Sequence, residues 1–381
     1  MTTSTPPPLR GPAFGSYAAA EVGWLLTDLS GIALEAPVEE REEAVQRGGA
    51  HYAESLPVEF QPDEAYLEVY RAALHASAAR LAHAVGTVTE LVLRERGPDV
   101  VLASLARAGT PVGILLRRWA AARHGLDLPH YAVSIVRGRG IDRVALDHLA
   151  AHHDPAHVVF VDGWTGKGAI QRELTAALAA YRYDTGAAFD PDLAVLADPG
   201  RCARTFGTRE DWLIASACLN STVSGLVSRT VLNDRLIEPG HYHGAKFYAE
   251  LAASDFSGDF LDAVTAAFDQ VDDTGEPPDR EPDHAGWAAV EKITTEHGIG
   301  DVNLVKPGVG ETTRVLLRRV PWKVLVRTGA PAADLAHVRL LAAQRGVPVE
   351  EVDDLAYNCV GLIHPRYTRG ATGSDGLAVA G

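Results

Sequence analysis

The sequence VVFVDGWTGKGA at residues 158–169 decides the expected fold class. Four apolar residues, enough for a short buried strand, lead to Asp162 and then to a loop rich in glycine. The next residues, IQRELTAAL from Ile170, place apolar side chains at helical spacing. A parallel strand that ends in a carboxylate and opens a helix presents backbone N–H groups to an anion. We therefore expect this loop to hold a ligand that carries a phosphate group.

Strand and helix patterns alternate on both sides of this loop. The helical pattern at 63–96 contains Gly86, which predicts two consecutive helices. Apolar runs typical of strands occur at 100–103, 131–136, 158–161 and 193–196, and further helical patterns at 110–123 and 142–152. This alternation predicts an α/β fold with a parallel sheet covered on both faces. Ligands of such sheets bind at the carboxyl ends of the strands, so the loops after Ala103 and Val161 are the expected binding positions.

An acidic, proline-rich stretch at 272–284 lacks apolar periodicity and is typical of a linker. A length of 381 residues favours two to three domains, at roughly 150 residues each. We expect a disordered tail at 1–13, a first domain at 14–271, a smaller α/β domain at 285–365 and a tail at 366–381. In the smaller domain, helical patterns end near 297 and span 311–318 and 332–345, and strand patterns span 323–327 and 347–352.

The negative charge of the chain, −15 in total, is unevenly distributed. Residues 1–284 carry 24 basic and 40 acidic side chains, whereas residues 285–381 carry 11 and 10. Residues 300–330 contain six basic residues and only two acidic ones, Asp301 and Glu311. A local basic face on an acidic protein attracts polyanions. A solvated helix side explains the same charges equally well.

The three cysteines form no Cys-x-x-Cys pair, so neither a disulfide framework nor a structural zinc site is expected. Residues 1–13 lack the charged start and apolar run of a signal peptide. No apolar segment reaches the roughly 18 to 20 residues that span a bilayer. These features predict a soluble, cytoplasmic protein.

Two common phosphate loops do not fit residues 162–168. A Walker loop needs four residues between its glycines and a Ser or Thr after the lysine, whereas only Trp164 and Thr165 separate Gly163 from Gly166, and Gly168 follows Lys167. A Rossmann dinucleotide site needs glycines at the start of the loop and an acid about 20 residues later. The spacing excludes both.

The strand, acid and small-residue loop resemble the site of type I phosphoribosyltransferases, and imply their Rossmann-like parallel sheet. The resemblance implies that Asp162 binds the ribose hydroxyls of phosphoribosyl pyrophosphate. Gly163 stands where that family often has a second acid. The 5-phosphate cradle then consists of Thr165, Gly166, Lys167, Gly168 and Ala169.

A second loop, LASLARAG at 102–109, resembles the pyrophosphate loop of the same class, so Arg107 is expected to face the leaving pyrophosphate. The segment SIVRGRGID at 134–142 adds Arg137 and Arg139, whose guanidinium groups suit phosphate oxygens. A surface turn is the equal alternative for this segment. Magnesium is expected only as the ion that bridges the pyrophosphate.

The first domain as a whole, roughly residues 14–270, resembles phosphoribosyltransferase-like proteins encoded with tellurite-resistance and stress genes, a group also described as the StiP cysteine protease family. Cys218 stands at the end of an apolar run, and histidines follow downstream. A thiol near a histidine is the pattern of a cysteine peptidase. A buried core thiol is the alternative. We expect an acceptor pocket made of Ser134, Cys218, Asn220, Ser221, Ser224, Arg229, His241 and His243.

Four histidines, at positions 148, 152, 153 and 157, form another cluster. A spacing of four places His148 and His152 on one helix face. No glutamate or cysteine completes a ligand set, so we expect solvated histidines at a helix end and no metal site.

The segment GVGETTR at 308–314 precedes a helix and a basic strand, and residues 300–363 resemble the Pelota-like and kink-turn RNA-binding ribosomal family. The resemblance implies RNA contacts through Gly310, Glu311, Thr313, Arg314 and Lys323. Gly310 stands where that family has an asparagine that reads bases. A structural or protein-docking role for the domain is the alternative.

Together these patterns predict a phosphoribosyltransferase, a glycosyltransferase in a stress-linked pathway, fused to an RNA-binding-like domain. Its expected partners are the phosphoribosyl donor, an unidentified acceptor and RNA. Two alternatives stay open: a StiP-type cysteine protease that uses Cys218 with a histidine, and a non-catalytic, nucleotide-sensing RNA-binding protein. A homodimer also stays open.

Overall fold

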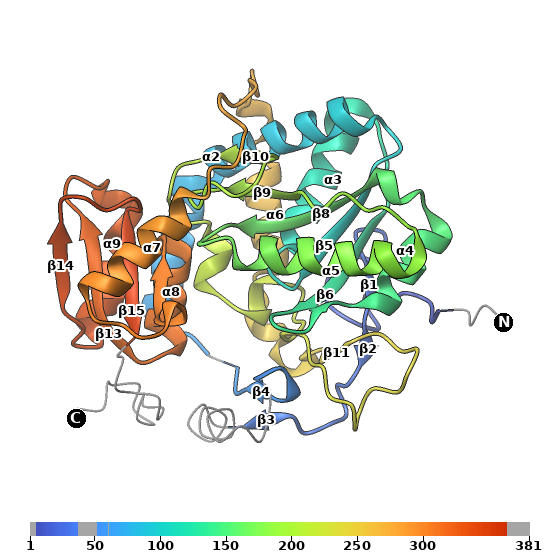
Figure 1. Cartoon of the computed structure of the whole chain (residues 1–381), viewed down its shortest axis with the longest axis horizontal. Helices are drawn as coiled ribbons and strands as arrows, with labels where there is room; N and C mark the ends of the chain where they lie inside the picture. The colour runs from blue at the N-terminus through green and yellow to red at the C-terminus, as the bar shows by residue number, and fades with distance from the viewer. Residues whose placement is uncertain (1–4, 37–51, 60, 364–381) are drawn as a thin grey trace.

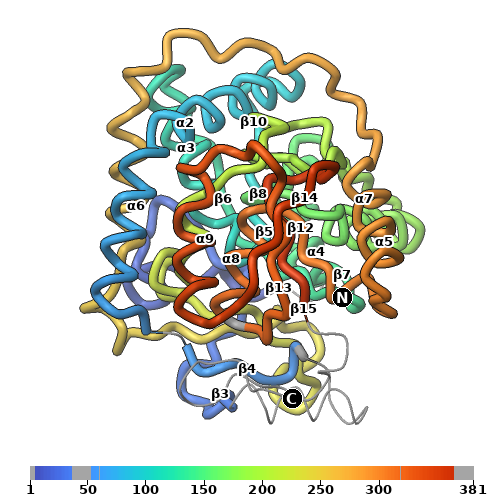
Figure 2. Tube along the Cα trace, turned by 90° about the vertical axis from the view of Figure 1, so that its left-hand side faces the viewer, coloured from blue at the N-terminus to red at the C-terminus, as the bar shows by residue number. Residues whose placement is uncertain are grey.

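The computed structural model describes residues 5–36, 52–59 and 61–363. Two units lie side by side (Figure 1): a larger one built around a seven-stranded sheet, and a smaller one, formed by the C-terminal residues, around a four-stranded sheet. Figure 2, viewed from the side of the smaller unit, shows that unit in front of the larger. The expected α/β class, with a parallel sheet and a smaller C-terminal domain, is confirmed.

The large sheet has the order β1-β6-β5-β8-β9-β10, and every neighbouring pair in this order is parallel. A short seventh strand, β7, pairs antiparallel with β6. The bounds are β1 Gly23–Leu25, β5 Val101–Ala106, β6 His130–Val136, β7 Gly140–Ile141, β8 Val158–Trp164, β9 Leu193–Ala197 and β10 Phe206–Thr208. Short two-stranded sheets join β2 Thr27–Asp28 to β11 Gly244–Ala245 and β3 Glu35–Ala36 to β4 Leu56–Pro57.

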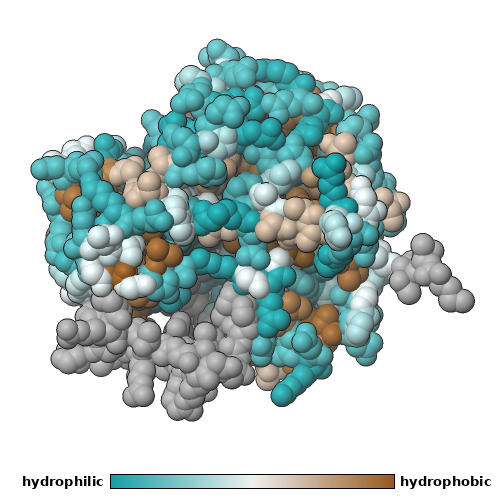
Figure 3. Space-filling view, in the orientation of Figure 1, coloured by the Kyte–Doolittle hydropathy of each residue, from teal (hydrophilic) through white to brown (hydrophobic). Residues whose placement is uncertain are grey.

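Helices cover both faces of the large sheet, as the alternating pattern predicts. One core joins the sheet to α2 Glu64–Arg96, α3 Thr110–His124 and α6 Ser257–Thr265. The opposite core joins it to α4 Arg143–His152 and α5 Ala169–Thr185. Burial of these apolar faces leaves mostly hydrophilic residues on the face shown in Figure 3. None of the helices in the described ranges has the length and apolar content to cross a membrane.

Helix α2 is continuous, so the two helices expected around Gly86 are wrong. A Cβ atom at Gly86 would lie 2.6 Å from the Trp119 ring of α3. The glycine therefore allows a close contact between helices rather than ending one. A glycine inside a helical pattern has both meanings, and the sequence alone does not separate them.

Strand β8 continues past the expected end, so Asp162 and Trp164 belong to the strand. Gly168 then takes a left-handed conformation, with φ of 74°, immediately before α5. Glycine adopts this conformation without steric cost. The loop that ends β8 thus turns sharply into the first N–H groups of a 17-residue helix.

The smaller unit has the strand order β12-β15-β13-β14. Helix α7 packs on one face of the sheet and α8 and α9 on the other. The bounds are α7 Ala285–Glu296, β12 Val305–Pro307, α8 Val309–Arg318, β13 Pro321–Arg327, α9 Ala332–Gln344, β14 Val349–Val352 and β15 Cys359–Ile363. The sequence patterns missed β12 and β15. Residues 272–284 connect the units without a helix or strand.

The two units share a tight contact. The Asp211 carboxylate of the larger unit accepts the N–H of Val309, the first residue of α8, and the N–H of Asn358, both at 2.8 Å. Arg80 of α2 also pairs with Asp334 of α9 at 3.2 Å. Apolar residues of α8 and α9 belong to the same core as α2.

The expected N-terminal tail is ordered where the structure describes it. Leu9 exchanges backbone hydrogen bonds of 2.9 and 2.8 Å with Trp24, and the Tyr242 hydroxyl donates to the carbonyl of Pro6. The apolar side chain of Leu9 packs against the core that contains α2, α3 and α6. This contact holds the proline-rich segment on the larger unit. Residues 1–4 and the expected tail at 366–381 lie outside the described residues.

Candidate functional site

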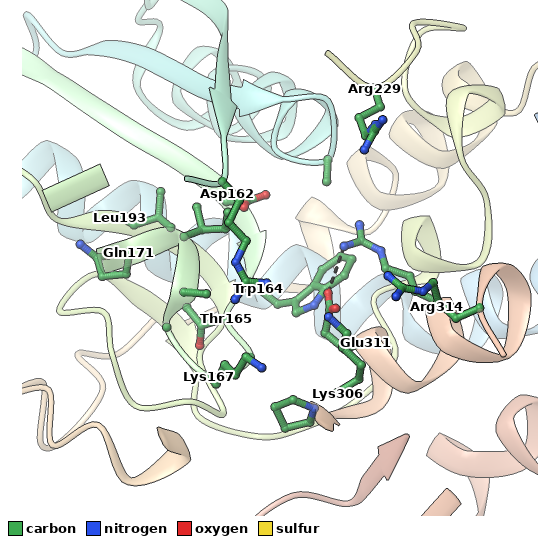
Figure 4. Close-up of a pocket in the computed structure, with 18 residues that line it drawn as sticks. Asp162, Trp164, Thr165, Lys167, Gln171, Leu193, Arg229, Lys306, Glu311 and Arg314 are labelled. Carbon is green, nitrogen blue, oxygen red and sulfur yellow. Dashed lines mark hydrogen bonds and ion pairs between the residues drawn. The ribbon is translucent and has the colours of Figure 1, made fainter. Parts of the chain in front are cut away.

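A cleft of about 510 Å³ lies between the two units (Figure 4). Its first wall is the end of β8 and the start of α5, and its second wall is β12 and α8. From the larger unit the lining residues are Ala108, Arg137, Asp162, Trp164, residues 165–171, Leu193 and Arg229; from the smaller unit they are Lys306, Pro307, Glu311, Arg314 and Arg319. The cleft therefore holds most of the expected phosphate loop together with residues of the second domain.

Asp162 is the carboxylate of the first wall. One of its oxygens accepts the N–H of Gly163 at 2.8 Å. Burial raises the pKa of Asp162 to about 6, against the opposing effects of this hydrogen bond and of Arg314. Gly163 is not among the cleft residues, so the position where a second acid is expected does not face this cavity.

The loop after Asp162 is held by the second domain. Lys167 donates to the carbonyl oxygens of Val302 and Val305, and the Tyr357 hydroxyl donates to the carbonyl of Gly166 at 3.1 Å. Burial lowers the pKa of Lys167 to about 7, and the nearby positive charges of Lys306 and Arg137 lower it further. The expected cradle is thus one wall of a cleft between domains.

Thr165 lines the cleft, but its polar atoms bind the protein. Its hydroxyl donates to Asp198, and its N–H donates to the carbonyl of Ala197 at 3.0 Å. Helix α5 begins four residues later, at Ala169, with no side-chain cap. Because the first N–H groups of a helix have no partner within it, residues 169–171 present donors at the cleft wall.

Trp164 and α8 meet across the cleft. The guanidinium carbon of Arg314 lies 4.4 Å from the centre of the Trp164 ring, and Arg314 donates to Glu311 at 3.1 Å. A Cβ atom at Gly310 would lie 2.8 to 3.0 Å from atoms of the Trp164 ring. Gly310 thus permits close domain contact and does not face solvent.

The five expected RNA residues do not form one surface. Glu311 and Arg314 line the cleft, and Gly310 packs on Trp164. Thr313 is fully buried, and its hydroxyl bonds to the Val309 carbonyl and to His337. Lys323, on β13, pairs with Glu350 at 2.7 Å and is not a cleft residue. Helical spacing alone did not show which face of α8 the first domain covers.

Arg107 lies apart from the cleft lining, although its neighbour Ala108 belongs to it. The Arg107 side chain, which is 12% exposed, donates to the Asn220 amide oxygen at 3.0 Å and lies 3.7 Å from the Glu59 carboxylate. Glu59 also accepts the N–H and the hydroxyl of Ser221, both at 2.7 Å. Sequence reasoning missed Glu59, because a residue so distant along the chain gives no local signal.

The remaining acceptor-pocket residues are dispersed. His243 and Ser134 share a hydrogen bond of 2.8 Å, and the N–H of His243 donates to Asp142. Arg229 lines the cleft and donates to the carbonyl of Ser55. The other expected pocket residues differ in exposure: His241 is exposed, whereas the buried ones are Cys218, Asn220, Ser221 and Ser224. Among the two expected pyrophosphate arginines of the 134–142 segment, Arg137 lines the cleft and Arg139 is exposed.

All three cysteines are buried. Burial raises the pKa of Cys202 and of Cys218 to about 12, and that of Cys359 well above the usual thiol range. The Cys202 thiol donates to Asp198 at 3.5 Å. Within the described residues no hydrogen bond joins a cysteine to a histidine, so the alternative in which Cys218 acts with a histidine finds no preformed pair.

The histidine cluster holds no metal arrangement. The rings of His148 and His152 stack at 4.2 Å, and His148 bonds to Thr5 and Tyr242. No group of three or more His, Cys, Asp or Glu residues in the described ranges has the arrangement of a metal site. His148 is buried rather than solvated, because Tyr242 and Thr5 cover it.

Comparison with known proteins defines the class of this chain. Residues 15–265 match the family described as tellurite-like stress resistance cysteine protease StiP, and residues 284–365 match the PELOTA RNA binding domain. The chain belongs to the StiP family. One relative is the cysteine protease StiP of Acinetobacter baylyi, which is 34% identical to this chain over 372 residues. The aligned region covers 92% of this chain and 94% of that protein.

These matches correct the predicted function. The StiP and Pelota resemblances are confirmed, whereas the phosphoribosyltransferase activity is contradicted, because both the family and the relative are described as cysteine proteases. The predicted transferase activity is therefore wrong, and the phosphoribosyl donor is unsupported. Magnesium was expected only as the ion bound to that donor. Neither the structure nor the comparisons support a homodimer.

Proposed function

We propose that this protein is a cysteine peptidase of the StiP type and that Cys202 supplies the thiol. The class rests on similarity along 92% of the chain to a protein named as a cysteine protease. The choice of residue rests on position: a Cβ atom placed on Gly168, a cleft residue, would lie 3.2 Å from the Cys202 sulfur. Cys202 thus lies directly behind the cleft wall.

The other two thiols have less favourable surroundings. Cys359 lies on β15, outside the residues 15–265 that match the protease family. Cys218 is 1% exposed within the first core, and the Tyr66 hydroxyl binds its carbonyl oxygen at 2.9 Å. Cys202 has a proton acceptor in Asp198, whose charge also raises the thiol pKa, and a cation, Arg172, that lowers it.

The chemistry requires a thiolate. In the proposed step the Cys202 proton passes to an oxygen of Asp198, and the sulfur attacks the carbonyl carbon of a peptide bond. The amine leaves with a proton, and water then hydrolyses the acyl-enzyme. Because Cys202 is 4% exposed, the proposed step requires the loop around Gly168 to move and admit the peptide.

Peptide hydrolysis by the full chain tests the proposal. Cys202→Ser should lower turnover of a casein-derived peptide mixture at least 100-fold and abolish labelling by iodoacetamide at that site. Cys218→Ser and Cys359→Ser are matched controls, since each removes one buried thiol, and both should retain activity. Loss in Cys218→Ser alone would move the nucleophile there, and full activity in all three variants would exclude a cysteine nucleophile. No turnover by the unaltered chain would reject the peptidase.

We further propose that the C-terminal domain binds RNA. The match of residues 284–365 to an RNA-binding domain supports this, as does the cationic cleft that the domain helps to form. Filter binding of single-stranded RNA to the full chain should weaken as salt rises, because phosphate contacts release counterions. No retention at low salt would reject RNA binding.

A further inference from the structure

We propose that RNA binds in the cleft between the two domains, and that the cleft receives one phosphorylated nucleotide at the end of a single strand. This inference deepens the proposed RNA binding and rests on it. It assigns the RNA site to residues of both domains rather than to the outer strand of the second domain. Three observations carry it: the charge of the cleft, its unused donors and its size.

The cleft gathers positive charge on a protein whose total charge is −15. Six basic side chains line it against two carboxylates, Asp162 and Glu311. The basic residues come from both units: Arg137, Lys167 and Arg229 from the larger, and Lys306, Arg314 and Arg319 from the smaller. Like charges held this close repel one another, and a bound anion relieves that repulsion.

Hydrogen-bond donors also converge on the cleft. The first turn of α5, at residues 169–171, lines it with backbone N–H groups at the positive end of a long helix. On the facing wall, the Nε atom of Arg314 is buried and has no hydrogen-bond partner among the residues that the structure describes. Lys306 points from β12 toward the same space in Figure 4. A phosphate group offers acceptors to the backbone N–H groups and to Lys306, and the Arg314 guanidinium adds positive charge to the facing wall.

The cleft volume limits what enters. About 510 Å³ is ordinary for a pocket that takes one small molecule. An RNA duplex is far too wide, so RNA enters as a single-stranded end whose terminal phosphate reaches the cations. Single strands are also the form of RNA whose nucleotides are free to separate from their neighbours.

The alternative RNA site, on strand β13 outside the cleft, has different electrostatics. Lys323 on β13 pairs with Glu350 at 2.7 Å, and Arg327 on the same strand donates to the Asn358 amide oxygen. Their charge is therefore partly used by the protein. The contrast between Lys306 and Lys323 provides a matched pair of lysines from neighbouring parts of one domain.

The test measures binding of a 5′-phosphorylated single-stranded RNA to the full chain, with a 5′-hydroxyl RNA and a free nucleoside monophosphate as further probes. Lys306→Gln should weaken binding about fivefold to tenfold and reduce the salt slope by about 0.7. Lys323→Gln should change affinity less than twofold. Arg137→Gln, from the larger unit, should also weaken binding several-fold, and thermal unfolding checks that each variant is folded.

Each outcome separates the two proposals. No binding of any RNA by the unaltered chain rejects the RNA function itself. Binding that Lys323→Gln weakens, while Lys306→Gln and Arg137→Gln do not, keeps the function and overturns the cleft assignment. Equal affinity for 5′-phosphate and 5′-hydroxyl RNA overturns the role of the terminal phosphate. Tight binding of the free nucleotide without any binding of RNA assigns the cleft to a nucleotide and overturns RNA as its source.

Discussion

Two arginines near neighbouring strand ends are surrounded in opposite ways. Arg107, after β5, is buried and faces the Asn220 amide and the Glu59 carboxylate, both from its own domain. Arg314 reaches the end of β8 from the other domain, pairs with Glu311, and keeps its Nε atom without a partner within the described ranges. Protein groups complete the first site, whereas excess cations leave the second suited to an anionic ligand. The comparison separates an arginine whose partners come from its own domain from a cluster of cations that outnumbers the carboxylates beside it.

The largest effect is expected from Glu59→Ala. The side chains of Glu59 and Arg107 are 9% and 12% exposed, so the variant leaves a buried guanidinium without its carboxylate. Removal of one partner from a buried pair costs about 3 kcal/mol of unfolding free energy. Urea denaturation measures it. Glu311→Ala, at the more exposed pair with Arg314, should cost less than about 1 kcal/mol; similar losses in both variants would remove the distinction.

Gly310→Ala should have the next largest effect. The new methyl group would overlap the Trp164 ring and disturb the contact that forms the cleft. Overpacking of this kind costs about 2 kcal/mol. Gly300→Ala is the control, since nothing lies within 4 Å of a Cβ atom there. Thermal unfolding and tryptophan fluorescence should change in the first variant only, and an unchanged first variant would contradict the close contact.

A smaller effect is expected from pH. The pKa of Lys167 is lowered to about 7, so this side chain loses its charge as pH rises from 7 to 8.5. A terminal phosphate, with a second pKa near 6, is already doubly charged over that range. RNA affinity should therefore fall about twofold to fivefold by pH 8.5. In Lys167→Arg the charge persists and the affinity should stay level; a parallel fall in both proteins would assign the effect elsewhere.

The same lowered pKa affects the unliganded protein with the opposite sign. Above pH 7 the unfolded chain holds the Lys167 proton while the folded protein releases it, so the Lys167 contribution to stability rises with pH up to the usual lysine range. Denaturation at pH 7 and 9 without RNA, compared with Lys167→Met, isolates this contribution. A difference that does not change with pH would show that Lys167 is charged throughout.

The smallest effect is expected at Lys323. Its pair with Glu350 is partly exposed, with side-chain exposures of 15% for Lys323 and 46% for Glu350. Such pairs contribute about 0.5 kcal/mol or less. Lys323→Ala should therefore unfold within that margin of the unaltered protein. A loss above about 1 kcal/mol would show that the outer strand is not the neutral reference that the comparison with the cleft requires.

The local sequence pattern was sufficient to predict the strands that are continuous apolar runs. The runs that became β5, β6, β8 and β9 are nearly continuous and apolar, as buried parallel strands require. Pattern failed where a residue has two meanings, as at Gly86, and where a strand is only three residues long, as in β12. Short strands depend on neighbours that are distant in the sequence.

The site was predicted only where its residues follow one another in the sequence. Asp162 and the loop after it follow from local pattern, and both line the cleft. Their partners do not: Glu59 reaches Arg107 from 48 positions earlier, and Lys306 and Arg314 arrive from another domain. Cys218 was a candidate nucleophile because histidines follow it downstream, yet the fold places its thiol in the core. Reactivity depends on surroundings that only the tertiary structure supplies.

Asp211 makes helix α8 depend on the larger unit. Its carboxylate accepts the N–H of the first residue of α8, so the N-terminal cap of a helix in the second domain belongs to the first domain. A fragment that starts at the linker would carry α8 without this cap, a loss of about 1 kcal/mol in a small domain. The isolated second domain should therefore be less stable than the same residues in the full chain.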